Sequence, residues 1–117
     1  MKLTIKGELT DLNTYINAER SNRFMGAKIK KQQTEIVYWA IKEQKLKKAQ
    51  GSVYMTYTWY CKNKKKDKDN IVFARKFIQD GLMTAGILKN DGWDDIEGFQ
   101  DVFEIDAANP RIEVEIV

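Results

Sequence analysis

The sequence predicts an α+β fold in which a mixed β-sheet of about four strands packs against two to three helices. Residues 53–61 alternate apolar and polar side chains and are rich in β-branched and aromatic residues, which is typical of a core strand. Residues 24–47 and 70–85 instead carry apolar residues at helical spacing. A chain of 117 residues is long enough for one core, so residues 1–117 are expected to form a single domain.

The N-terminal half begins with an alternating segment, residues 2–8, which predicts a half-buried strand. Thr10 or Asp11 is a plausible N-cap for a short helix that ends at a polar break, residues 21–22. The long helix over about residues 24–47 follows. Its expected apolar face comprises Ile29, Ile36, Val37, Trp39, Ala40 and Ile41.

The C-terminal half continues from the core strand through a lysine-rich loop into the helix at about 70–85, which Gly86 ends. Residues 96–106 and 111–117 then read as two strands. Asp101 interrupts the apolar alternation of the first of these. It either leans toward a metal site or is an inward charge that protects an edge strand from aggregation.

Composition removes several classes of chemistry. The chain has no histidine and only one cysteine, Cys61, so Ser-His-Asp and Cys-His catalysis and histidine-ligated zinc are excluded. Cys61 falls in the core strand, where packing is expected rather than reactivity. No apolar run approaches a membrane span and no signal-peptide pattern is present, so an intracellular protein is expected.

Charge is divided unevenly along the chain. Residues 1–66 carry 15 basic and 5 acidic side chains, a net of +10, whereas residues 67–117 carry 5 basic and 12 acidic ones, a net of −7. Carboxylates concentrated beside a basic surface suit metal-dependent phosphodiester chemistry on nucleic acid, whereas a simple basic binding module does not need the acids.

The junction of the two halves holds the strongest candidate site. Asp67 and Asp69 are one residue apart, and Mg²⁺ commonly binds one or two carboxylates together with substrate phosphates. Solvated turn chemistry before a helix explains the same residues equally well. The cations expected to contact DNA phosphates are Lys62, Lys64, Lys65, Lys66 and Lys68 in the loop, Arg75, and Arg20, Arg23 and Lys28 near the start of the long helix.

Two further residues enter the candidate site. Lys76 follows Asp69 by seven residues, so in one continuous helix the two side chains would point in nearly the same direction, about 10 Å apart along the axis. Asp91 lies in an Asn-Asp-Gly turn, which backbone preferences alone explain. Asp94 and Asp95 are similarly ambiguous.

Three segments in order resemble the RusA family of Holliday junction resolvases, common in bacteriophages and prophages. They are Asp67-Lys68-Asp69-Asn70, the helix from Arg75 to Leu82, and the turn from Ala85 to Asp91. The spacing from Asn70 to Lys76 is about a half to one helical turn longer than in the best-known member, and Asn90-Asp91 stands where that member has two consecutive acids.

The resemblance implies a bacterial, cytoplasmic α/β homodimer that nicks four-way DNA junctions symmetrically. It further implies that Asp67, Asp69 and Asp91 are catalytic and hold Mg²⁺, or Mn²⁺ in its place, and that Lys76 is the catalytic lysine. A non-catalytic DNA-binding module is the main alternative, and a flap or branch nuclease remains open. A calcium loop fails because Ile71 and Val72 stand where a ligand and the obligatory glycine belong.

Overall fold

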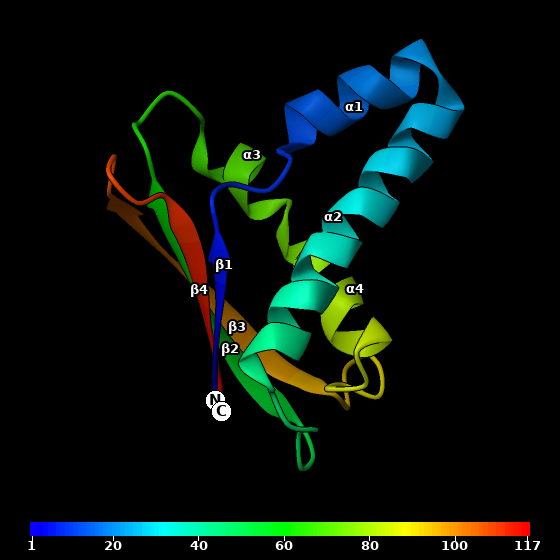
Figure 1. Cartoon of the computed structure of the whole chain (residues 1–117), viewed down its shortest axis with the longest axis vertical. Helices are drawn as coiled ribbons and strands as arrows, with labels where there is room; N and C mark the ends of the chain where they lie inside the picture. The colour runs from blue at the N-terminus through cyan, green and yellow to red at the C-terminus, as the bar shows by residue number, and fades with distance from the viewer.

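The computed structural model describes all 117 residues and confirms the α+β class with a mixed four-stranded sheet. Helices cover one face of the sheet (Figure 1). The strand order is β1-β4-β2-β3, in which β2 pairs parallel with β3 and antiparallel with β4. The elements are β1 (Lys2–Lys6), α1 (Leu12–Ser21), α2 (Arg23–Gln44), β2 (Val53–Cys61), α3 (Lys68–Val72), α4 (Arg75–Thr84), β3 (Ile96–Ile105) and β4 (Arg111–Ile116).

Strand β2 is central, and its side chains alternate as the sequence predicts. The odd-numbered residues from Val53 to Cys61 are all buried against the helices, and Met55 and Tyr57 are completely inaccessible. The even-numbered residues lie on the uncovered face, where β-branched and aromatic side chains fit a pleated surface.

Helices α1 and α2 begin where the capping residues predict. The carboxylate of Asp11 accepts a hydrogen bond from the Thr14 N–H, which makes Asp11 the N-cap of α1. Asn22 forms the polar break: its backbone N–H closes α1 on the Ala18 carbonyl, and its side-chain oxygen accepts from Phe24 N–H at the start of α2.

The single helix predicted over residues 70–85 is wrong in one respect, because the chain breaks it into α3 and α4 at residues 73–74. Hydrogen bonds of the tighter i→i+3 kind join Ala74 N–H to the Ile71 carbonyl and Lys76 N–H to the Phe73 carbonyl. The predicted common direction of Asp69 and Lys76 assumed one continuous helix. That assumption does not hold across the break.

The core lies between the sheet and the helices and contains 19 buried apolar residues. The predicted apolar face of α2 is correct for Val37 and Ile41, which are buried, and wrong for Ile36 and Trp39, which are 46% and 65% exposed. The predicted face is broader than the surface that β1 and α4 cover.

Helices α2 and α4 approach closely at Gly81. A Cβ atom at this position would lie 2.5 Å from Cγ1 of Val37, closer than real contacts allow. Glycine at position 81 therefore sets the distance between α4 and α2. None of the helices is long and apolar enough to cross a membrane.

Candidate functional site

An open groove of about 910 Å³ lies beside α3, between the lysine-rich loop and the end of β3. Asp67 and Asp69 both line it, and Phe103 and Ile105 of β3 form its apolar side. Strand β2 ends at Cys61 and leads directly into the loop, so the two carboxylates follow the central strand of the sheet.

Asp67 occupies the N-cap position of α3 without acting as a cap. Its backbone is extended, as at other N-caps, but its side chain makes no capping hydrogen bond. Its carboxylate also forms no ion pair despite the neighbouring lysines, whereas Asp69 accepts one hydrogen bond, from the Asn70 N–H, at 3.0 Å. Helix capping therefore does not explain Asp67, and its carboxylate is available to a ligand.

Asn70, the last residue of the Asp-x-Asp-Asn motif, has a structural role. It is buried, and its side-chain oxygen accepts a hydrogen bond from the Asn13 N–H at 2.8 Å. Because the first N–H groups of a helix lack partners within the helix, this bond both satisfies α1 and fixes α3 to it. Asn70 thereby fixes the position of the segment that carries the two aspartates.

The loop lysines are not equivalent. Lys66 forms an ion pair with Asp11 at 2.9 Å, and Lys62 lies 3.8 Å from a carboxylate oxygen of Glu8. The Lys68 ammonium lies 5.2 Å from the centre of the Phe103 ring in the groove, which is a cation–π contact. Lys64 and Lys65 form no ion pair and are the loop lysines most available to a phosphate.

The Lys66–Asp11 pair shifts the pKa of both groups. Burial alone would raise the pKa of Asp11, but hydrogen bonds from Thr14 and Lys66 outweigh it and the pKa falls below its usual value. The hydrogen bond to Asp11 raises the pKa of Lys66. Lys66 therefore fixes the loop to the start of α1, and the prediction of a DNA contact for this residue stays untested.

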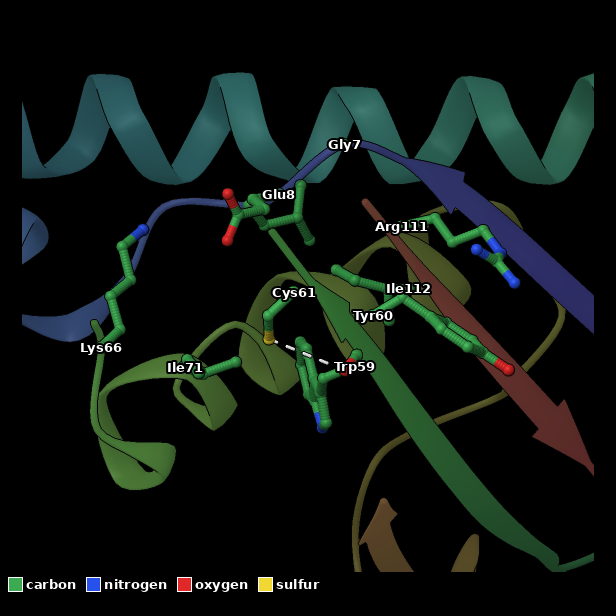
Figure 2. Close-up of a pocket in the computed structure, with 10 residues that line it drawn as sticks. Gly7, Glu8, Trp59, Tyr60, Cys61, Lys66, Ile71, Arg111 and Ile112 are labelled. Carbon is green, nitrogen blue, oxygen red and sulfur yellow. Dashed lines mark hydrogen bonds between the residues drawn. The ribbon is translucent and has the colours of Figure 1, made fainter. Parts of the chain in front are cut away.

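A small pocket behind the loop has room for about one water molecule, with a volume of about 20 Å³. Figure 2 shows Cys61 at this pocket, with its sulfur directed to the Trp59 carbonyl at 3.6 Å. Cys61 is buried and burial raises the pKa of its thiol. Cys61 packs in the core, as its place in the strand predicts.

The other predicted DNA contacts, Arg20, Arg23 and Lys28, lie around the turn that joins α1 to α2. None of the three forms an ion pair, although Arg23 lies over the ring of Phe24 at 5.0 Å. Figure 1 shows this turn and the lysine-rich loop at the same end of the long axis, on opposite sides of the molecule. The predicted cations thus form two separate patches.

Lys76 and Asp91, two of the predicted site residues, form an ion pair. The Lys76 ammonium lies 3.8 Å from a carboxylate oxygen of Asp91 and 3.4 Å from one of Asp80. Asp80 also lies 3.8 Å from the ammonium of Lys30 on α2. Sequence reasoning missed Asp80 and Lys30. The i,i+4 spacing of Lys76 and Asp80 was a visible signal, but the contact with Lys30 depends on helix packing.

The structure does not bring the three predicted aspartates into one group, because no three carboxylate or cysteine side chains converge in the chain. Asp67 lies six residues after Cys61, the last residue of β2, whereas Asp91 lies five residues before Ile96, which pairs with Val53 at the opposite end of β2. Asp67 and Asp69 share only the lining of one groove, and a Mg²⁺ ion commonly takes one or two protein carboxylates together with water and phosphate oxygens. A cage of three carboxylates is not formed.

The Arg75 side chain forms its contacts within the protein. Its guanidinium donates to the Asp101 carboxylate at 2.8 Å and lies 4.5 Å from the centre of the Phe99 ring. Asp101 also accepts a hydrogen bond from the indole N–H of Trp59 at 2.9 Å. Asp101 therefore fixes the start of α4 to β3 and does not lean toward the Asp67–Asp69 pair.

The loop before β3 is fixed by its backbone. The carbonyl of Asp95 accepts from the Val53 N–H at 3.0 Å, and neither Asp94 nor Asp95 forms an ion pair through its side chain. Trp93, which lies in the chain between Asp91 and Asp94, is 98% exposed. The amino-acid composition gave no indication of an exposed tryptophan.

The uncovered face of the sheet carries few free cations. Lys2 and Arg111 both contact Glu113, and Arg111 also contacts Asp106. Lys6 alternates with Lys2 on β1 and forms no ion pair. Most of the positive charge on this face is therefore neutralised within the sheet.

No family model matches this chain, and no curated protein matches it.

Proposed function

We propose that this protein is a metal-dependent endodeoxyribonuclease that cuts branched DNA, in the manner of the RusA resolvases it resembles. The observation that carries the proposal is the groove beside α3. There Asp67 and Asp69 line the same space as Lys64 and Lys68, and the Asp67 carboxylate has neither a capping nor an ion-pair role. Asp67 and Asp69 are both exposed, so their carboxylates are open to a ligand that enters the groove.

In this proposal Asp67 and Asp69 hold Mg²⁺, which Mn²⁺ can replace. The ion, when bound, activates water and stabilises the charge that develops on the phosphate. Lys64 and Lys65 attract the DNA backbone, and Lys68 narrows the groove against Phe103. Lys76, beside Asp91, neutralises phosphate charge at a second position, so Asp91 acts with the lysine rather than with the first two carboxylates.

The proposal includes a homodimer, because a four-way junction has near two-fold symmetry and needs two cuts. The two edges of the sheet differ in a way that supports pairing through β3. At β1 the Gln44 amide accepts from the Thr4 N–H and donates to the Thr4 carbonyl, which closes that edge. At β3 no element covers the edge, and Phe99 and Ile105 are about half exposed, at 45% and 49%.

The decisive test is cleavage of a synthetic four-way junction in Mg²⁺, with flap and duplex DNA in parallel and the cut sites mapped. The wild type is expected to make paired cuts in the junction. Asp67→Asn and Asp69→Asn should bind the junction but lose cleavage by about 100-fold or more. Glu115→Gln, an exposed change on β4, is the matched control and should cut normally.

The competing function is a non-catalytic DNA-binding module, which the absence of a three-carboxylate group favours. It predicts junction binding that weakens steeply with salt and no cleavage in any divalent metal. Undiminished cutting by Asp69→Asn would exclude the proposed site, and binding without cutting by the wild type would establish the competitor.

A further inference from the structure

Asp80 is a partly buried acid that the proposed chemistry does not use. Its side chain is 13% exposed, and its Oδ2 atom is inaccessible to solvent and accepts no hydrogen bond. Thr34 Oγ1 is a second buried oxygen without a partner, and the Thr34 carbonyl faces Gly81, the residue after Asp80. A buried carboxylate that lacks hydrogen bonds destabilises a fold unless nearby cations compensate for it.

Two lysines supply that compensation from different helices. The Lys76 ammonium lies 3.4 Å from Oδ1 of Asp80, and the Lys30 ammonium lies 3.8 Å from Oδ2. Both distances exceed those of charge-assisted hydrogen bonds, which are about 2.7–2.9 Å. Both lysine side chains are also 51% exposed, so each ammonium keeps hydrogen-bonding capacity directed to solvent.

The arrangement differs from the ion pairs that hold the fold together. Lys66 with Asp11 and Arg75 with Asp101 are closed, at 2.9 Å and 2.8 Å. The Asp80 contacts are open, and the same Lys76 ammonium is also 3.8 Å from Asp91. Lys76 is thus held between two carboxylates without being saturated by either.

We propose that Asp80 is a positioning residue that holds the Lys76 ammonium beside Asp91, and that Lys30 is the counter-ion that keeps Asp80 compensated when Lys76 turns to a DNA phosphate. Without Lys30, movement of Lys76 toward the phosphate would leave the inaccessible Oδ2 atom of Asp80 without a cation. With Lys30 in place, Lys76 can be shared between Asp80 and the phosphate at lower cost. This inference rests on the proposed nuclease function.

Single-turnover cleavage of the four-way junction tests it through a double-mutant cycle. Asp80→Asn should slow cleavage by about 10- to 100-fold, since small displacements of a catalytic group have effects of that size. Junction affinity should change by less than about 3-fold. Because Asp80 acts through Lys76, Asp80→Asn should have no further effect in a Lys76→Ala background. Losses that multiply in the double variant would overturn the inference and assign Asp80 a general structural role.

Two further measurements keep the test decisive. Lys30→Gln leaves Asp80 in place and should slow cleavage in the same way, again only when Lys76 is present. Urea unfolding of each variant reports whether it is folded, and Glu115→Gln serves as the control.

A chemical readout separates this inference from the function. Limited acetylation followed by mass spectrometry should modify Lys76 more in Asp80→Asn than in the wild type, while Lys64, which has no ion pair, is modified equally in both. If the wild type does not cut DNA, the nuclease proposal fails and the positioning role of Asp80 in cleavage fails with it. If it cuts but Asp80→Asn changes neither rate nor labelling, only the Asp80 inference fails.

Discussion

Gly81→Ala tests the packing that brings α4 against α2. Helix propensity favours the substitution, because alanine is more stable than glycine in a helix interior by about 1 kcal/mol. The structure predicts the opposite result. The new methyl group would lie 2.5 Å from Cγ1 and 2.7 Å from Cβ of Val37, which is completely buried.

Overpacking of a tight core costs about 1–3 kcal/mol. After the gain in helix propensity, a net loss of up to about 2 kcal/mol in unfolding free energy remains. For a domain of this size the melting temperature should fall by up to about 8 °C. Urea titration and thermal melts followed by circular dichroism measure both quantities.

Gly26→Ala is the matched control, since Gly26 is a buried glycine in α2. Its new Cβ would lie 3.2 Å from Cγ of Glu19, a flexible side chain that can move. This variant should be neutral or slightly stabilised. In the double variant Gly81→Ala with Val37→Ala, the loss should be smaller than the sum of the single losses, because the second change removes the clashing methyl groups. A stabilised Gly81→Ala protein, or strictly additive losses, would refute the close approach.

Two more predictions concern the β1 edge and the Lys66–Asp11 pair. Gln44→Ala removes both hydrogen bonds to Thr4, so it should lower the unfolding free energy by about 1 kcal/mol. It should also uncover the β1 edge and promote concentration-dependent association, which light scattering measures. Glu43→Ala, at the neighbouring position, should have neither effect. The pKa of Asp11 is lowered in the folded state, so its contribution to stability is present above the unfolded value near 3.8 and is lost as the pH falls through the folded value. Lys66→Met should raise the pKa of Asp11 and reduce the loss of unfolding free energy between pH 5 and about pH 2. Urea titrations at each pH measure this loss. An unchanged dependence of the unfolding free energy on pH would contradict the pairing.

The sequence predicts most of the fold because its signals are local. Alternation over residues 53–61, the Asp11 cap and the start of the long helix depend on neighbours in the chain. The predicted end of that helix at about residue 47 is wrong, because α2 ends at Gln44 and Lys45 takes the left-handed conformation. The break at residues 73–74 was missed because Ile71, Ala74 and Ile78 keep helical spacing across it. A periodic pattern cannot reveal a change in hydrogen bonding that preserves the apolar stripe.

The candidate site was harder to predict because its contacts join distant segments. Asp101 was visible as an anomaly in an apolar strand, but its partner Arg75 is 26 residues away. Asp80 and Lys30 meet only because Gly81 lets α2 and α4 approach. Spacing along the chain nominated candidate residues, but it could not show which of them lie in contact. The three-carboxylate group predicted by resemblance is not formed within one chain.

The break between α3 and α4 has a consequence for the proposed chemistry. Asp67 and Asp69 are positioned by Asn70, which is bonded to α1. Lys76 belongs to α4, whose first residue is fixed to β3 by Asp101. The two parts of the site therefore have independent supports, so the residues between Asn70 and Lys76 decide how they lie relative to each other.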